Sequence, residues 1–387
     1  MVTSRSNILF VLTPQFHPNT GGVQMTTYKL ARWFANCGHR VSIFSFELEG
    51  HIQQDFAQLL VPASSGGVKN PRNLTSLEIA LESVGPDVVI NQMPYEHAIG
   101  DVLARQKEYL LLGCLRNTLY SVKGNIDGYA ATVLPRFARP VFRNAIGRHA
   151  LWLLHRIRHR TDLKRILSTY DKFVMFGPPN LDELRAFVPE YDAEKICLIP
   201  NSVPCVVDNV PAKENRILWL GRLEYKQKRA DLILPLWERL ASALPGWHLD
   251  VVGDGPALAE LREDAESRGL VRVTFHGRQR PDSFFERASV FVMTSAYEGF
   301  PNVLVEAQSY ACIPVVFDSF PIARWIINQG KDGFLEEPFS IAAMGDRIIR
   351  IANGHDSHEL MANALENAKR FEIGNVGPMW LSLFESS

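Results

Sequence analysis

The chain has 387 residues, of which 46% are hydrophobic and 21% charged, and its formal net charge is −1. This composition excludes a disordered chain, and the near-neutral charge excludes a polycation for nucleic acid. The longest apolar run covers seven residues, 109–115, far short of the ~20 residues that a membrane helix needs. The cysteines contain no CxxC pair, so we expect reduced core cysteines of a cytosolic protein rather than disulfides or a zinc site.

The first half alternates between strand-like and helix-like segments. An apolar run at 7–12 is typical of a strand buried on both faces, and a helix is expected over 23–37 because Gly38 follows it as a natural C-terminal cap. Further strands are predicted at 41–46, 87–91, 109–114 and 172–176. This alternation predicts a parallel, doubly wound sheet.

The same alternation restarts after a turn-rich stretch at 199–204. Strands are predicted there at 216–220, 249–252, 271–275, 290–293 and 314–317. The expected fold class is therefore α/β, with two Rossmann-like parallel-sheet domains, 1–200 and 201–370.

A basic segment at 136–165 departs from its surroundings. It contains eight Arg and one Lys against a single acid, Asp162, and large apolar residues are interleaved among the cations. We interpret it as a basic amphipathic insert in the N-terminal domain. A solvated helical face and a contact with an anionic membrane surface are both compatible with this pattern.

The strongest motif follows the buried strand at 290–293. Two acids, Glu298 and Glu306, are eight residues apart, and Pro301 suits the start of a helix. Such a loop presents backbone N–H groups and a positive helix end to an anion, and Glu306 offers two oxygens to a ribose diol. A strand–turn–helix corner with surface glutamates is the alternative.

Cations and glycines mark other loops at the ends of predicted strands. Arg222, Lys226, Lys228 and Arg229 follow the strand that ends at Gly221, where they would suit a diphosphate. A solvated basic loop would show the same pattern. Further glycine corners occur at Gly253 and, in the first half, at Gly22, although neither belongs to a G-x-G-x-x-G fingerprint.

Taken together, the strings G-R-L-x5-R-x-D-x-I, V-V-G-D-G-P and E-G-F-P-N-V-L-V-E-A resemble glycosyltransferase family 4, the retaining GT-B enzymes. The first loop, P-x-x-x-P-x-x-G-G-V-Q, and the closing segment from Phe371 are similar to that family as well. The resemblance implies two domains facing a cleft, with a C-terminal helix, 371–387, that returns to the N-terminal domain.

The resemblance also implies roles for matched residues. Arg222 and Lys228 would hold the donor diphosphate, Glu306 the nucleotide ribose, and Glu298 the transferred sugar. The remaining donor-side positions are Gly22, Gly221, Gly253, Gly299, Phe300, Pro301, Asn302 and Leu304. No metal and no cofactor are expected, because cations and helix ends would stabilise the leaving group, and no protein nucleophile is nominated.

One position departs from the family pattern. Many relatives carry a histidine after the fourth N-domain strand, where this chain has Asn91 or Met93, and His97 is the candidate replacement. A surface or capping role is the alternative, and it is the more frequent one for a lone histidine near the start of a helix. Arg116 and Asn117, after the next strand, are candidate contacts to the acceptor.

The resemblance predicts a retaining, metal-independent transferase that moves a hexose-type sugar from a UDP- or GDP-sugar to a glycan or lipid-linked acceptor. Bacterial surface polysaccharide assembly is the expected pathway, in the cytoplasm or peripherally on the inner face of the membrane. The alternatives are a non-catalytic membrane-associated subunit and an epimerase or phosphorylase of the same fold. A nicotinamide dehydrogenase is disfavoured because no first loop carries the dinucleotide fingerprint.

Overall fold

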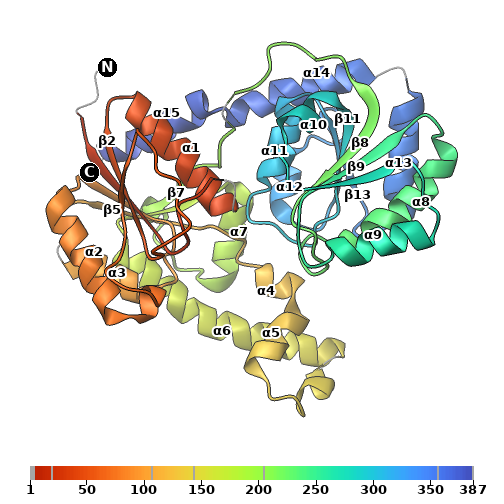
Figure 1. Ribbon diagram of the computed structural model, residues 1–387. Helices are drawn as coiled ribbons and strands as arrows, with labels where there is room; N and C mark the ends of the chain where they lie inside the picture. The colour runs from red at the N-terminus through yellow and green to blue at the C-terminus, as the bar shows by residue number, and fades with distance from the viewer. Residues whose placement is uncertain are drawn as a thin grey trace. The chain divides into compact units, whose positions relative to one another are not determined.

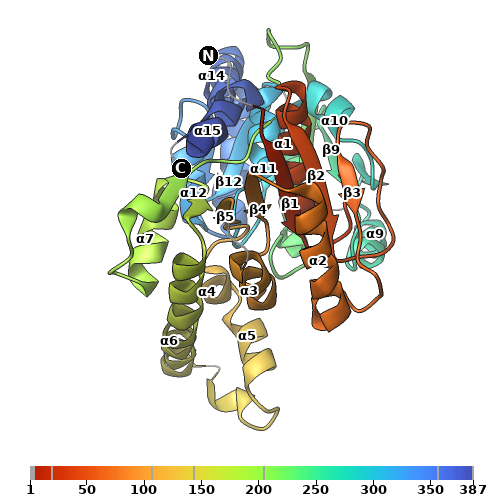
Figure 2. The same ribbon diagram turned by 90° about the vertical axis from the view of Figure 1, so that its left-hand side faces the viewer.

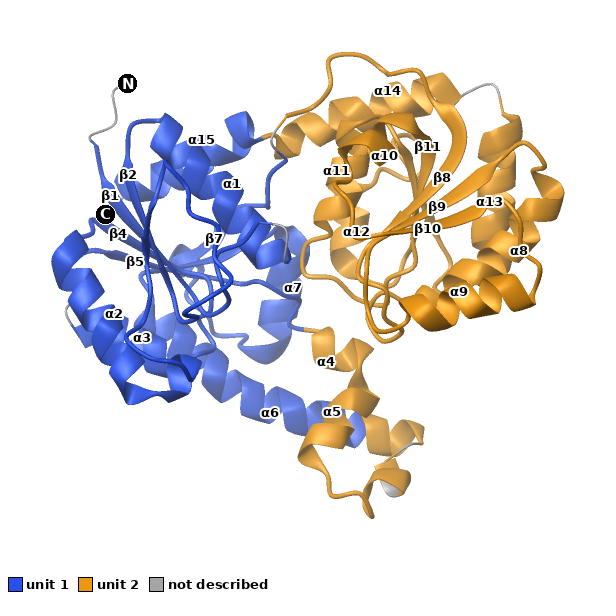
Figure 3. Cartoon of the chain, in the orientation of Figure 1, with its two compact units in different colours: residues 1–119, 149–204, 373–387 blue, residues 120–148, 205–372 orange. Residues whose placement is uncertain are grey.

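The computed structural model describes residues 5–18, 21–105, 108–142, 144–203, 205–354 and 357–385. The chain forms two compact units, coloured separately in Figure 3. Unit 1 comprises residues 1–119, 149–204 and 373–387, and unit 2 comprises residues 120–148 and 205–372.

Unit 1 is built on a sheet of seven parallel strands in the order β3-β2-β1-β4-β5-β6-β7. The strands are β1 (Asn7–Leu12), β2 (Arg40–Ser45), β3 (Gln58–Leu60), β4 (Val88–Asn91), β5 (Leu110–Cys114), β6 (Lys172–Met175) and β7 (Ile196–Leu198). Strand β1 is central because Ile8 lies opposite both Val41 and Val88. Its apolar run fills the core, as a strand covered on both faces requires.

Helices also contribute to unit 1. They are α1 (Gly22–Asn36), α2 (Pro71–Val84), α3 (His97–Arg105), most of α6 (Ala145–Thr169), α7 (Pro178–Phe187) and α15 (Ile373–Glu385). The C-terminal helix α15 packs on α1 beside it (Figures 1 and 2), where the rings of Phe34 and Phe384 lie 5.4 Å apart. A Cβ added at Gly377 would come within 2.4 Å of the Trp33 ring, so glycine permits this close approach. The predicted return of the last helix to the N-terminal domain is therefore confirmed.

Unit 2 repeats the topology with six parallel strands in the order β10-β9-β8-β11-β12-β13. The strands are β8 (Glu214–Leu220), β9 (His248–Val252), β10 (Val273–Gly277), β11 (Ala288–Met293), β12 (Ile313–Phe317) and β13 (Phe334–Glu336). Helices of this half are α8 (Ile233–Ala243), α9 (Leu258–Ser267), α10 (Asp282–Arg287), α11 (Asn302–Ser309), α12 (Pro321–Ile326), α13 (Ile341–Asn353) and α14 (Ser357–Ala368). Both sheets are wholly parallel, so the expected α/β fold class with two Rossmann-like domains is confirmed.

The segment between β5 and β6 differs from the expected single insert. Residues 120–148, with α4 (Ser121–Gly124) and α5 (Ile126–Val133), belong to unit 2, whereas the sequence analysis assigned them to the N-terminal domain. In both views α5 lies beside the first turns of α6, where Arg148 Nη1 pairs with Asp127 at 2.9 Å (Figures 1 and 2). The basic segment 136–165 therefore crosses from unit 2 into unit 1 within helix α6.

Candidate donor and acceptor sites

Strand β8 lies at the point where the strand order of unit 2 reverses. Its neighbours are β9 on one side and β11 on the other. Parallel α/β sheets bind ligands outside the carboxyl ends of the strands at such a reversal. A donor site is therefore expected at the loops that follow β8 and β11, which contain the two strongest sequence motifs.

The central contact of this region joins those two loops. Lys228 Nζ lies 2.6 Å from Glu298 Oε1, and only 20% and 7% of the two side chains are exposed. The second carboxylate oxygen of Glu298 accepts a hydrogen bond from Gln227 Nε2 at 3.2 Å. The structure thus brings together a cation and an acid that are 70 residues apart in sequence.

Residues that the sequence analysis did not single out hold this pair in place. Glu224 accepts hydrogen bonds from the backbone N–H groups of Gln227 and Lys228, each at 2.8 Å. Thr294 Oγ1 accepts from Trp219 Nε1 at 2.9 Å and donates to the Lys228 carbonyl at 2.7 Å. Glu224 and Thr294 lie next to the two motifs, which was the only signal in the sequence. The partners of Thr294 are 75 and 66 residues away, so its contacts could not be predicted from the sequence.

The four cations of the β8 loop have different environments. Arg222 and Lys226 are exposed, and neither side chain has an ion pair with any residue that the structure describes. Arg229 instead binds Asp231 with its guanidinium, at 2.7 Å from Nη2, and lies 4.8 Å from the Phe339 ring centroid. Its φ of 50° is left-handed, a conformation that normally favours glycine. The Arg229 side chain is therefore occupied by contacts within the protein, whereas the Arg222 side chain is free to bind a ligand.

Two glycines allow the β9 loop to approach the β8 loop. Gly253 has a φ of 139°, and a Cβ there would lie 1.8 Å from the Gly221 carbonyl oxygen. Gly255 has a φ of 157°, with Leu223 O 2.3 Å from its hypothetical Cβ. The predicted glycine corner is thus a backbone-to-backbone contact that positions the loop carrying Arg222.

The motif after β11 forms the predicted corner, with Pro301 as N-cap of α11 and Glu306 half-buried on that helix. Gly299 and Pro301 are buried, and Asn302 is half-buried. The Phe300 ring packs against Phe371 at 5.7 Å, and Leu304 is fully buried. Backbone groups of this corner, rather than the side chains of Phe300 and Leu304, are the parts suited to a ligand.

The segment 120–133 adds a neighbour to this site within unit 2. A Cβ at Gly124 would come within 2.7 Å of the Tyr297 ring, and the Tyr297 side chain hydrogen-bonds with Asn125. Burial is the largest cause of the raised pKa of Tyr297. Tyr297 directly precedes Glu298, so this segment supports the β11 loop.

In unit 1, the expected first-loop glycine lies where predicted, because Gly22 is the first residue of α1. Asn19 and Thr20 of that loop lie outside the described residues. His97 is the first residue of α3, and its Nε2 is 3.1 Å from Asp162 Oδ1 on α6. This contact ties α3 to α6.

Asn91 does not occupy a ligand-facing position. It is fully buried, its Nδ2 donates to the Tyr170 hydroxyl at 2.6 Å, and its Oδ1 accepts from the Met93 backbone at 2.9 Å. The Asn91 amide, at one of the two positions where the resemblance expects a histidine, therefore joins β4 to the chain after α6.

Arg116 and Asn117 follow β5 at the carboxyl edge of the unit 1 sheet. Arg116 Nε donates to Gln92 Oε1, and Nη1 donates to Asn201 Oδ1 at 3.2 Å. Asn117 is exposed, and its Oδ1 accepts from the Thr118 backbone at 2.9 Å. The sequence did not identify Gln92 and Asn201, because neither belongs to a motif. Gln92 follows an apolar strand, and Asn201 lies in a turn-rich stretch.

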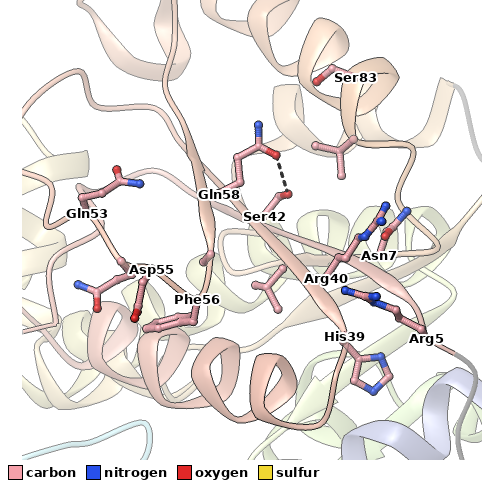
Figure 4. A pocket seen from close by; sticks show the side chains of 14 residues that line it. Arg5, Asn7, His39, Arg40, Ser42, Gln53, Asp55, Phe56, Gln58 and Ser83 are labelled. Atoms are coloured by element: carbon pink, nitrogen blue, oxygen red, sulfur yellow. Dashed lines mark hydrogen bonds between the residues drawn. The ribbon is translucent and has the colours of Figure 1, made fainter.

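A cavity of about 700 Å³ lies elsewhere in unit 1, around the amino ends of β1 and β2 (Figure 4). Its walls carry Arg5, His39 and Arg40, and Ser42 donates to Gln58 within it. Ligands of parallel sheets bind at the opposite, carboxyl end of the strands, so we do not assign the candidate site to this cavity.

The described residues contain neither a metal-binding cluster nor a helix that could span a membrane. No group of three or more His, Cys, Asp or Glu side chains there is arranged to hold a metal ion. Among the same residues, no helix is both long and apolar enough to cross a membrane.

Family comparisons cover nearly the whole chain. The model "Glycosyltransferase Family 4" matches residues 20–206, and "Glycosyl transferases group 1" matches residues 207–371. The amylovoran biosynthesis glycosyltransferase AmsD of Erwinia amylovora is 36% identical over 120 residues, 30% of this chain and 33% of AmsD. An N-acetyl-D-galactosaminyltransferase of Campylobacter jejuni, whose name specifies a glycan on PP-undecaprenol, is 27% identical over 173 residues, 44% of this chain and 48% of that protein.

These alignments span only about a third to a half of the curated relatives. Among solved structures, Anabaena HepE in complex with UDP-glucose matches with a TM-score of 0.71 at 15% identity, covering 98% of this chain and 100% of HepE. At that identity the match supports the fold, and the two family models carry the assignment. The chain belongs to glycosyltransferase family 4.

Proposed function

We propose that this chain is a retaining, metal-independent glycosyltransferase that moves a hexose-type sugar from a nucleotide-sugar to a glycan or lipid-linked acceptor. The observation that carries the proposal is the arrangement at the carboxyl edge of unit 2. There the buried Lys228–Glu298 pair lies in the same loop system as the exposed Arg222. Retention is the part that follows from family resemblance alone.

This arrangement suits the chemistry of a sugar–diphosphate bond. When the bond breaks, positive charge develops on the sugar and negative charge on the leaving diphosphate. Lys228 and Arg222 would stabilise the leaving group, and the buried carboxylate of Glu298 would meet the sugar. A metal ion can supply the same stabilisation to a leaving group, but two cations at this edge make it dispensable.

The relatives support a donor and a pathway. HepE is named as a complex with UDP-glucose, which favours a UDP-sugar here, and AmsD is named for amylovoran biosynthesis. The Campylobacter enzyme is named for an acceptor on PP-undecaprenol. We therefore infer bacterial surface polysaccharide assembly, with an acceptor that is itself a glycan or is linked to a lipid.

The alternatives make different demands on the same site. A non-catalytic subunit would tolerate loss of the cation–carboxylate pair, yet Lys228 and Glu298 are in contact at 2.6 Å. An epimerase or phosphorylase would use the same donor loops but release a product without a second sugar. Transfer assays that follow both donor consumption and chain extension separate these alternatives from a transferase.

The test of the reaction uses purified protein, a UDP- or GDP-sugar and an undecaprenyl-diphosphate glycan. Transfer should survive EDTA, and product NMR should show the anomeric configuration of the donor sugar retained. Loss of turnover on chelation, restored by Mg²⁺ or Mn²⁺, would contradict metal independence, and an inverted anomer would contradict retention.

We further propose that the basic helix α6 contacts an anionic membrane surface. On its unit 1 portion Leu153, Leu154 and Ile157 are exposed by 41%, 39% and 70%. At 100° per residue these side chains share one face, and Arg158 lies at its border. An apolar stripe with cations at its edge is the pattern of a helix that lies in a lipid interface.

Ion pairs within the protein reduce the number of cations available to lipid. Arg160 and Lys164 both bind Glu190, at 2.6 and 2.7 Å, and Arg165 binds Asp101 at 2.7 Å. Arg158 is exposed and has no ion pair with a described residue. A cation near an anionic bilayer contributes about 1 kcal/mol, so the unpaired Arg158 should matter more than its paired neighbours.

The vesicle experiment therefore compares two variants of equal charge change. Wild type should co-sediment with vesicles rich in anionic lipid at low salt and be released as salt rises. The double variant Ile157→Gln, Arg158→Gln should lose most of this binding, whereas Arg185→Gln on α7, whose arginine pairs with Asp182, should retain it. Equal binding by both variants would show that α6 is only a solvated helix.

A further inference from the structure

The guanidinium of Arg116 is incompletely satisfied in unit 1. Its Nε and Nη1 atoms donate to the amide oxygens of Gln92 and Asn201. Its Nη2 atom is buried and has no hydrogen-bond partner among the residues that the structure describes. In a guanidinium, Nε and Nη2 form one edge, and this edge commonly donates two hydrogen bonds to the oxygens of a carboxylate or phosphate.

A second unsatisfied donor belongs to Gln92, the residue that accepts from Arg116 Nε. Gln92 is 1% exposed, and its Oε1 is used by Arg116 Nε, which fixes the orientation of the amide. Its Nε2 atom is then also buried without a partner in the described part of the chain. Two buried donor groups on adjacent side chains cost free energy unless an acceptor oxygen reaches them.

The positive charge of Arg116 is equally unbalanced. Its side-chain partners are the amides of Gln92 and Asn201 and the buried thiol of Cys114, whose pKa is raised by burial, so none of them supplies a negative charge. No Asp or Glu among the described residues forms an ion pair with it. Burial is the main cause of the lowered pKa of Arg116. Lys29 is a second cation near this position. Its Nζ donates at 3.4 Å to the carbonyl of Ser202, the residue that follows Asn201.

We propose that Arg116 and Gln92 form an oxyanion-binding site, which holds an anionic oxygen of the acceptor at the carboxyl edge of the unit 1 sheet. The inference rests on the proposed function, and it specifies the acceptor as one that carries a phosphate or a carboxylate. Both donor atoms are buried, whereas the Arg116 side chain is half-buried and Asn117, the next residue, is exposed.

A buried water would explain only part of these observations. A water oxygen can accept hydrogen bonds from Arg116 Nη2 and Gln92 Nε2, but it leaves the guanidinium charge uncompensated. An oxyanion does both. The two explanations differ in whether anions bind and in whether their binding depends on Arg116.

The first test is calorimetric titration at constant ionic strength with two probes, inorganic phosphate and glucuronate. The probes are titrated into wild type, Arg116→Gln, Arg222→Ala and the double variant. At least one probe should bind wild type, and Arg116→Gln should raise its Kd at least tenfold in both backgrounds. Arg222 is in unit 2, so an equal loss in both backgrounds assigns the binding to the Arg116 site.

The identity of the responding probe distinguishes the sources of the anion. An Arg116-dependent response to phosphate indicates an acceptor with a phosphate group, as in a lipid-linked diphosphate. A response to glucuronate alone indicates an acidic sugar. If neither probe binds in an Arg116-dependent manner, the proposal is overturned, and the donors are satisfied by water.

The second test uses Gln92→Glu, which gives Arg116 a carboxylate of its own at nearly the same shape. The variant should melt at or above the wild-type temperature, because the buried guanidinium gains a counter-charge, yet it should lose the Arg116-dependent binding of the probe. Retained binding in a stable Gln92→Glu protein would contradict the proposal. Arg185→Gln, an exposed arginine on α7, is the matched control and should change neither property.

The outcome is separable from the proposed function. Nucleoside-diphosphate binding depends on unit 2 and should be unaltered in Arg116→Gln, while transfer should show a raised KM for the acceptor. If Arg222→Ala leaves nucleotide binding intact, the assignment of the donor site is wrong. The oxyanion titration then still tests the Arg116 site independently.

Discussion

The two sheets of this chain share strand order and direction, but they balance the charge at their carboxyl edges differently. In unit 2, Lys228 meets the carboxylate of Glu298 at 2.6 Å. In unit 1, Arg116 contacts the amide oxygens of Gln92 and Asn201 and the thiol of Cys114, and it has no carboxylate partner among the described residues. Topology places a cation at the same edge in both units, whereas local partners decide whether that cation is already neutralised.

This difference has a consequence for what each edge requires. The Lys228–Glu298 pair is complete within the protein, so a ligand must compete with or share an existing contact. The Arg116 site lacks its counter-charge, so an anion would complete it. Removal of Lys228 is therefore expected to lower the free energy of unfolding, because it leaves a buried carboxylate without its cation, whereas removal of Arg116 leaves no carboxylate unpaired.

The largest expected effect is on turnover when donor-site cations are removed. Arg222→Ala and Lys228→Ala should each lower transfer by about 10²–10³-fold, because each removes a preorganised stabiliser of the leaving diphosphate. Only Lys228→Ala should also lower the melting temperature, since it leaves Glu298 buried without its cation. Steady-state kinetics and thermal melting measure the two effects separately.

The control for these variants is Arg185→Ala, which removes an exposed arginine of α7 in unit 1. It should keep turnover within a few-fold of wild type. Near-wild-type turnover in both Arg222→Ala and Lys228→Ala would show that the loop is a solvated face, and the contrast between the two units would then have no functional meaning.

The next effect concerns the backbone contact that positions the unit 2 loop. Gly253→Ala should cost about 3 kcal/mol of unfolding free energy, because its Cβ would collide with the Gly221 carbonyl at a φ of 139°. Gly269→Ala has a φ of +62° but nothing within 4 Å of the Cβ, so about 1 kcal/mol is expected. Chemical denaturation provides both values, and equal costs would exclude a steric role for the Gly221 contact.

The smallest effect is a pH dependence confined to unit 1. Burial lowers the pKa of His155 to about 4, with a further contribution from His159. The folded state therefore prefers neutral His155, so its stabilising contribution is present above pH 6.5 and is lost as the pH falls toward 4. His155→Gln should lose roughly 2–4 °C less than wild type between pH 7 and pH 5. An equal fall in melting temperature between pH 7 and pH 5 in the two proteins would contradict this assignment.

Much of the fold could be predicted because its central strands are apolar runs. The expected strand at 290–293 is the core of β11, and that at 41–46 corresponds to β2 within one residue. The strands β3, β7 and β13 were not predicted, since each has three residues and lies at or near a sheet edge, where burial leaves a weak pattern.

The candidate site was predictable in part for a related reason. Lys228 and Glu298 belong to contiguous motifs, but their mutual contact depends on how β8 and β11 pair. Arg229 carries the same charge as Arg222, yet its left-handed φ and its contact with Asp231 divert it from a ligand. Gln92 belongs to no motif, and only the folded edge shows that it faces Arg116.

The most direct test of the donor site is calorimetric titration of UDP, GDP and ADP into wild type and Arg222→Ala. Arg222 is exposed and unpaired with described residues, so its removal should leave the fold intact. We predict that one of the three nucleotides binds wild type and that Arg222→Ala weakens its binding at least tenfold. Failure of all three to bind folded wild type, or equal binding by the variant, would contradict the assignment of the donor site to unit 2.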